Sequence, residues 1–122
     1  MNENVFFVIV EKGEKILLLE DFFGEFHLPF GMIINHESIN QALLRAMMDQ
    51  VCLSVKNIKR EFTAKDLKNR SRIFVIEVVD PEDLLLKEYK GYGWVDPKEA
   101  FGYPIKEDLR KILDLYLKLM QS

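Results

Sequence analysis

The sequence contains little that would mark a secreted, membrane-bound or nucleic-acid-binding protein. It has one cysteine, so no disulfide can form within the chain, and we expect a reducing, cytoplasmic location. No apolar run approaches the roughly 18 residues of a membrane span. No basic segment precedes the first apolar run, so we expect no secretory signal. The net charge of −3 gives no general attraction to nucleic acid or to an anionic membrane, and neither is expected as a partner.

What is present predicts a globular domain. The 122 residues are 48% hydrophobic and 30% charged, which favours a single domain over residues 1–122 with one core. Apolar runs and 3.6-residue periodicity predict strands and two main helices. The strands are expected at 5–10, 16–19, 25–30, 55–64, 70–79 and 91–95, and the helices at 37–52 and 106–119. This order predicts an α+β fold, an α/β/α sandwich with a mixed β-sheet between helices.

The segment Leu28–Leu53, LPFGMIINHESINQALLRAMMDQVCL, contains the most specific motif. Five residues separate Gly31 from Glu37, seven separate Glu37 from Arg45, and the segment ends on an aliphatic residue. This spacing resembles the Nudix box, GX5EX7REUXEEXGU, in which U is aliphatic. Trp94–Ala100 is similar to the tryptophan strand and following turn near the end of many Nudix domains. The resemblance implies a Nudix-like sheet between helices, with Glu37 and Arg45 paired and Gly31 in a tight turn as the structural part of the box.

The metal-binding part of the box is incomplete. Where the box has glutamate at three helix positions, this chain has Ala46, Asp49 and Gln50, and Cys52 replaces the glycine. The resemblance implies that these positions hold magnesium or manganese against a substrate diphosphate. Magnesium prefers hard oxygen ligands such as carboxylates, so losing two anionic ligands should severely weaken its binding. We therefore expect weak or lost hydrolysis of nucleoside-diphosphate-linked substrates, with retained binding of a nucleotide-like ligand or a partner, and possible function without a metal.

Two other functions stay open. In the first, an active metal-dependent pyrophosphohydrolase builds a non-standard metal site from Gly31, Asp49 and Gln50, with Asp49 and Glu88 as catalytic candidates. In the second, the domain is a structural or regulatory module that forms a homodimer. Leu44 and Met48 favour this reading, because they make the second face of the predicted helix unusually apolar.

Aromatic and basic residues are the candidates for ligand binding. The resemblance implies that Phe26 and Phe30, which lie just before the box helix, could stack on a base, although core packing is the commoner role of such residues. Lys59 and Arg72 belong to a basic stretch that could contact phosphates, although a solvated hairpin is the commoner interpretation. The basic residues of this stretch are Lys56, Lys59, Arg60, Lys65, Lys68, Arg70 and Arg72.

The two histidines flank the box loop. His27 and His36, with Asp49 nearby, offer imidazole and carboxylate ligands that suit zinc or another transition metal. Two separate surface histidines are the commoner arrangement, and it is the one we favour.

Overall fold

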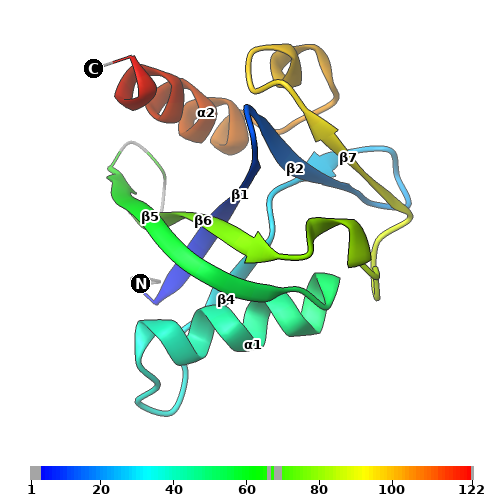
Figure 1. Cartoon of the computed structure of the whole chain (residues 1–122). Helices are drawn as coiled ribbons and strands as arrows, with labels where there is room; N and C mark the ends of the chain where they lie inside the picture. The colour runs from blue at the N-terminus through cyan, green and yellow to red at the C-terminus, as the bar shows by residue number, and fades with distance from the viewer. Residues whose placement is uncertain (1–3, 66, 68–69, 122) are drawn as a thin grey trace.

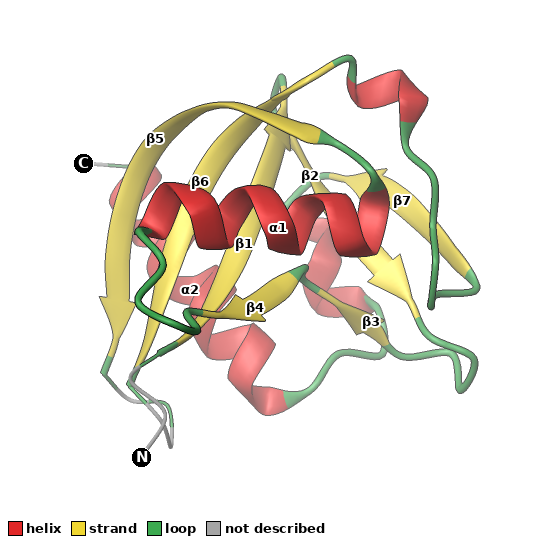
Figure 2. Cartoon of the chain, turned by 90° about the horizontal axis from the view of Figure 1, so that it is seen from below, coloured by secondary structure: helices red, strands yellow, loops and turns green. Residues whose placement is uncertain are grey.

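The structure is a computed structural model that describes residues 4–65, 67 and 70–121. A mixed sheet lies between two helices, α1 (Ile39–Val51) and α2 (Glu107–Met120), as Figure 1 shows. Helix α1 packs on one face of the sheet, and α2 packs on the opposite face (Figure 2). The predicted α+β sandwich is confirmed.

The sheet of the described residues contains seven strands. They are β1 (Val5–Lys12), β2 (Lys15–Glu20), β3 (Phe26–His27), β4 (Phe30–Met32), β5 (Ser54–Ala64), β6 (Ser71–Val79) and β7 (Gly91–Val95). Their order is β3-β2-β1-β6-β5, with β4 paired to β1 and β7 paired to β2. Strands β1 and β6 are parallel and the other pairs are antiparallel, so the sheet is mixed, as predicted.

The core has two layers because successive side chains of a strand point to opposite faces. On β1, Phe6 and Val8 pack toward α1, whereas Ile9 packs toward α2. The apolar stripe of α1 includes Leu43, and that of α2 includes Ile112. Burial on both faces explains why β1 reads as an unbroken apolar run and not as an alternating one.

The strand predicted at residues 25–30 is in fact two short strands. Strand β3 pairs with β2, and β4 pairs with β1. Between them, the Pro29 carbonyl accepts a hydrogen bond from the Val8 amide at 2.8 Å, and a proline cannot donate one in return. Gly31 consequently lies in strand β4, where it faces Phe6, and the expected tight turn at Gly31 is wrong.

The box helix is shorter than the predicted span of 37–52. Ser38 is its N-cap: the Ser38 hydroxyl accepts from the Gln41 amide at 3.2 Å, and the Gln41 side chain accepts from the Ser38 amide at 2.9 Å. This reciprocal pair is a capping box. Glu37 therefore precedes the helix, and its expected place in the first turn is wrong. At the other end Cys52 has a φ of 58° and stops the helix after Val51.

Two 3-10 helices complete the described part of the chain. They are η1 (Pro81–Asp83) and η2 (Glu99–Gly102). No described helix combines the length and apolar character needed to cross a membrane.

Candidate ligand-binding site

The loop before α1 is fixed by a bidentate ion pair. The Arg45 guanidinium donates to both carboxylate oxygens of Glu37, at 2.9 and 2.8 Å. Arg45 also donates to the Met32 carbonyl at 2.6 Å, and Glu37 accepts from the Ile34 amide at 3.0 Å. The hydrogen bond from Arg45, followed by that from Ile34, lowers the pKa of Glu37 to about 2. The pairing implied by the box resemblance is thus present, and it joins β4, the loop and α1.

Strand β4 and helix α1 lie close together at Gly31. A Cβ built at Gly31 would lie 2.7 Å from the Phe6 ring and 2.9 Å from the Ala46 methyl group. Real Cβ contacts essentially never occur at these distances. Ala46 is itself only 2% exposed. The position where the box has its first helix glutamate is therefore filled by core packing in this chain.

Gln50 is used to hold β4 against the helix. Its side-chain oxygen accepts from the Phe30 amide at 3.3 Å, and its nitrogen donates to the Phe30 carbonyl and, at 3.2 Å, to the Ala46 carbonyl. An amide nitrogen cannot coordinate a cation while it carries these hydrogens. The Gln50 side chain thus satisfies backbone groups of the Phe30 peptide, which leaves it poorly suited to a metal.

The box face of α1 offers a magnesium ion one carboxylate, that of Asp49. Magnesium takes about six oxygen ligands in a near-octahedral array, commonly with one or two carboxylates from the protein. Asp49 is exposed, and it is the single carboxylate among the three box positions. Its charge acts on Arg45, whose pKa is raised first by the hydrogen bond to Glu37 and then by the charges of Glu37 and Asp49.

Glu88 lies in the exposed loop before β7. Burial, followed by the charges of Glu88 and Asp21, raises the pKa of Tyr89. Glu88 and Asp21, which lies in the β2–β3 loop, thus both act on Tyr89. The predicted catalytic role of Glu88 with Asp49 stays a prediction.

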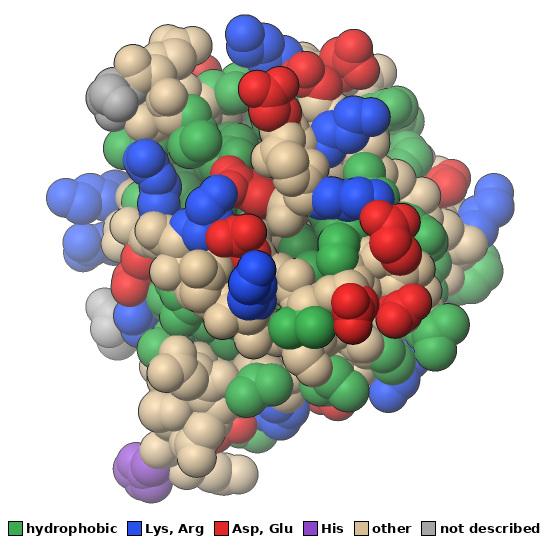
Figure 3. All heavy atoms as spheres, viewed as in Figure 1, with side chains coloured by type: hydrophobic (Ala, Val, Ile, Leu, Met, Phe, Trp, Pro, Cys, Tyr) green, Lys and Arg blue, Asp and Glu red, His purple; other side chains and the backbone are tan. Residues whose placement is uncertain are grey.

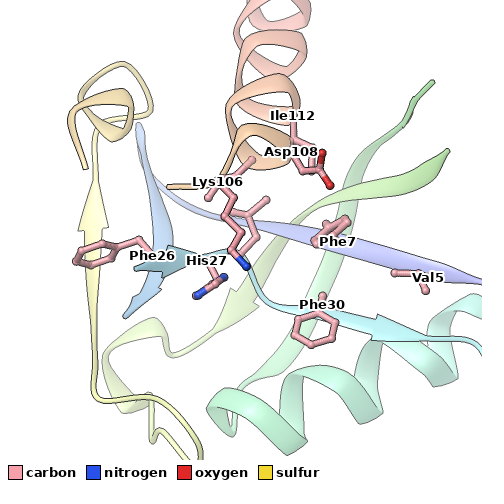
Figure 4. Close-up of a pocket in the computed structure, with 10 residues that line it drawn as sticks. Val5, Phe7, Phe26, His27, Phe30, Lys106, Asp108 and Ile112 are labelled. Atoms are coloured by element: carbon pink, nitrogen blue, oxygen red, sulfur yellow. The ribbon is translucent and has the colours of Figure 1, made fainter. Parts of the chain in front are cut away.

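A cavity of about 300 Å³ opens beside the box segment, between the sheet and the start of α2 (Figure 4). Its walls come from four elements and the β3–β4 link: Val5, Phe7, Phe26, His27, Leu28, Phe30, Lys106, Asp108, Leu109 and Ile112. The rings of Phe7 and Phe30 lie 6.4 Å apart at a tilt of 45°, whereas Phe26 packs against Tyr103 with centroids 5.1 Å apart. Lys106 and Asp108 bring one charge of each sign to an otherwise apolar space.

The candidate binding residues are divided between two regions. Phe26 and Phe30 both line the cavity. Lys59 instead forms an ion pair with Glu11 at 2.5 Å, and Arg72 forms one with Glu61 at 2.7 Å. Basic and acidic side chains are mixed over the face that includes β5 in Figure 3. Lys68, a member of the predicted basic stretch, lies outside the described residues.

The sequence missed most of the cavity. Phe7 was expected only as part of a buried strand, and Lys106 only as the start of a helix. These two residues are about 100 positions apart, so no local pattern connects them. The signal that was available is the run of phenylalanines before the box, since Phe26 and Phe30 do reach the cavity.

The grouping of His27, His36 and Asp49, which we did not favour over two separate histidines, is not a metal-ligand cluster within the described residues. His36 is exposed in the loop before α1 with a φ of 62°. His27 lies on β3, and its ring is close to the carboxylates of Asp21 and Glu25.

Comparison with known proteins identifies the fold. No family model matches the chain, and no curated protein sequence matches it. Solved structures do match over nearly the whole chain. The E. coli ORF135 protein has a TM-score of 0.70 at 24% identity, covering 95% of this chain and 89% of its own. A putative Nudix hydrolase family member from Chromobacterium violaceum has a TM-score of 0.77 at 18% identity, covering 100% and 81%. A C. elegans Ap4A hydrolase has a TM-score of 0.71 at 14% identity, covering 96% and 98%.

The protein is an α/β/α sandwich with a mixed sheet. Strand β4, which contains Gly31, leads through a loop into helix α1, as the Nudix box resemblance implies. The fold of the protein is that of the Nudix hydrolases. Identities of 24% and below establish the fold alone. The activity has to be argued from the residues of the site.

Proposed function

We propose that this chain is a Nudix-fold protein that binds a nucleotide-like ligand in the cavity and hydrolyses diphosphate-linked substrates weakly or not at all. The loss of hydrolysis is supported by two of the three box positions of α1, which are engaged in packing and hydrogen bonding. Ala46 is buried against Gly31, and Gln50 is bonded to the Phe30 peptide. Asp49 alone leaves one anionic ligand where the box has three, which weakens the hold on a divalent ion bound to a diphosphate.

The cavity supports the binding half of the proposal. A concave, mostly apolar space of a few hundred Å³ is the usual form of a small-molecule site. The rings of Phe7 and Phe30 offer apolar surfaces for a planar group, and Lys106 offers a cation at the rim. Structures of the same fold include an Ap4A hydrolase in a binary complex and a dihydroneopterin triphosphate pyrophosphohydrolase. Both names refer to phosphorylated compounds with a heterocyclic ring, which is the class of ligand we propose here.

Hydrolysis is tested with untagged protein and a panel of nucleoside diphosphate derivatives, at millimolar magnesium or manganese. We expect turnover well below the range of about 1–1000 per second that is typical of enzymes. Turnover inside that range would contradict the proposal. If such turnover is also abolished by Asp49→Asn, the non-standard metal site becomes the better explanation.

Ligand binding is tested by thermal shift with the same compounds, with and without a chelator. A ligand that binds only the folded state stabilises it in proportion to ln(1 + [L]/Kd). We expect shifts that persist in chelator and shrink in Lys106→Glu. Lys15→Glu is the matched control, because Lys15 is an exposed lysine at the start of β2 and the change in net charge is the same. The absence of any shift, or equal shifts in both variants, would contradict binding in this cavity.

A homodimer through α1 is the second candidate. Leu44 and Met48 lie one turn apart on the outer face of α1 and are 46% and 43% exposed. Burial of such a face in a second copy would be stabilising. Size-exclusion chromatography with light scattering measures the mass directly, and a dimer that Leu44→Glu converts to a monomer would support this candidate. A strict monomer at high concentration would remove it.

A further inference from the structure

The connection between β2 and β3 is a tightly bonded turn. The Asp21 amide donates to the Glu25 carbonyl at 2.9 Å, which closes the turn across its base. One carboxylate oxygen of Asp21 accepts from the Phe23 amide at 2.8 Å and from the Glu25 amide at 3.0 Å. Beyond the turn, His27 pairs with Leu19 in the sheet. The backbone on both sides of the turn is thus fixed by hydrogen bonds.

This turn places three metal-ligating groups together. Glu25 and His27 are two positions apart in extended chain, so their side chains point to the same side, and Asp21 lies opposite Glu25. One ligand atom from each of Asp21, Glu25 and His27 lies within 4.8 Å of the other two. The second Asp21 oxygen, free of the turn, is 2.6 Å from His27 Nε2. All three residues are partly buried.

These distances are close to those of a zinc site. Zinc bonds to imidazole nitrogen and carboxylate oxygen are about 2.0–2.2 Å long, so two ligand atoms in a tetrahedral site are about 3.4 Å apart. The Asp21–His27 contact at 2.6 Å would have to widen, and the longest separation, at most 4.8 Å, would have to shorten. Both changes require rotation of the Asp21, Glu25 or His27 side chains.

We propose that Asp21, Glu25 and His27 bind one divalent transition-metal ion, for which zinc is the best match. The imidazole favours zinc and other transition metals over magnesium, which prefers oxygen ligands. Two carboxylates and one neutral imidazole leave a fourth position for water or a ligand group. His27 pairs across the sheet with Leu19, which packs on the α1 side, and its ring lies 6.3 Å from that of Tyr89, so the ion would lie on the face of the sheet that carries α1. The site involves none of the three box positions, so it does not depend on the loss of hydrolysis proposed above.

The test uses the full chain without a His-tag, freed of metal by a chelator. Zinc is titrated in competition with a chromophoric chelator, and cobalt is added separately, because a tetrahedral cobalt site gives a visible spectrum. We expect one ion per chain, with the affinity reduced at least about tenfold in His27→Gln and in Glu25→Gln, because losing even a residue that only orients a ligand commonly costs about 10–100-fold. Glu25→Gln preserves the turn, because Glu25 contributes to it through its backbone.

Two matched variants serve as controls. His36→Gln removes the exposed histidine, and Asp49→Asn removes the box carboxylate. We expect both to bind zinc as the wild type does. Circular dichroism at the titration temperature establishes that each variant is folded. The proposal is overturned if no stoichiometric ion binds, if binding survives both His27→Gln and Glu25→Gln, or if it is lost in either control. The hydrolysis assay above is unaffected by each of these outcomes, so the two proposals fail separately.

Discussion

Gly31 is the residue at which a single added methyl group should have a large effect. It lies in β4 with ordinary strand geometry, so its requirement is space and not an unusual backbone conformation. Because the added Cβ would meet the Phe6 ring and the Ala46 methyl group, Gly31→Ala should destabilise the fold by about 1–3 kcal/mol through overpacking. Urea unfolding at pH 7 measures this free energy.

Gly102→Ala is the control for the glycine prediction. A Cβ at Gly102 meets nothing within 4 Å, and the φ of Gly102 is not positive. We expect this variant to leave the free energy of unfolding unchanged or to raise it by about 0.5 kcal/mol. Equal changes in the free energy of unfolding in Gly31→Ala and Gly102→Ala would contradict the close packing of β4 against α1.

The ion pair between Glu37 and Arg45 predicts how stability depends on pH. The pKa of Glu37 is lowered from 4.5 to about 2 in the folded protein. A carboxylate with a depressed pKa stabilises the fold fully above its unfolded pKa, and this contribution is lost as pH falls through the folded value. The contribution of Glu37 should therefore be complete above about pH 5.5 and decline toward about pH 2.

The variant Glu37→Gln tests that dependence. Its melting temperature should lie below that of the wild type near neutral pH, and the difference should shrink as the pH is lowered from about 6 to about 2.5. Arg45→Met should show most of the same loss, because Arg45 is the largest cause of the lowered pKa. A difference that stays constant over this pH range would contradict the role of the pair.

At the scale of elements, helix α1 ends at a strained residue. Cys52 occupies the position where the box has glycine, and its φ of 58° is in the left-handed region. Non-glycine residues are disfavoured there, and glycine is the usual residue after a helix. Cys52→Gly should therefore raise the free energy of unfolding by about 0.5–1 kcal/mol. Cys52→Ala is the control, since it removes the thiol and keeps the strain, and it should not stabilise.

Strands β1 and β6 and helix α2 were predictable from the sequence because each buries a continuous face or stripe. Strands β1 and β6 are covered on both faces, and α2 buries one stripe, so their apolar patterns are strong. The predicted segments 5–10, 70–79 and 106–119 agree with the observed bounds to within two residues at each end. Length and burial on two faces therefore suffice to locate an element from its pattern.

The short elements were not predictable in the same way. Strands β3 and β4 have two and three residues, and each exists because a different partner strand pairs with it. The box spacing did predict the Glu37–Arg45 pair, since both residues lie in one loop–helix unit. The cavity joins residues from opposite ends of the chain, and such a site follows only from the tertiary structure.

At the scale of the whole molecule, one buried polar cluster connects three distant elements. Glu11 on β1 is only 5% exposed at its side chain and forms an ion pair with Lys59 of β5. The Tyr116 hydroxyl, from α2, donates to the other carboxylate oxygen of Glu11. Burial, followed by this hydrogen bond, raises the pKa of Tyr116. The cluster thus ties helix α2 and the edge strand β5 to the centre of the sheet.

Replacing one member of this cluster should lower the free energy of unfolding more than replacing all three. Tyr116→Phe should destabilise by about 1–3 kcal/mol, because the buried Glu11 carboxylate loses a donor. Lys59→Met should also destabilise, because it leaves that carboxylate without its cation. The triple variant Glu11→Leu/Lys59→Met/Tyr116→Phe should recover to within about 1 kcal/mol of the wild type, since no unpaired charge remains buried.

Urea unfolding of the two single variants and the triple variant measures this non-additivity. Lys118→Met is the control, because the pair of Lys118 with Asp114 is exposed at 71% and 59%, and its loss should change stability by less than about 1 kcal/mol. If the triple variant is less stable than either single variant, then the cluster contributes net stability to the fold. If it recovers, the cluster serves to fix α2 and β5 in register on the sheet, and the apolar packing around Glu11 supplies the stability.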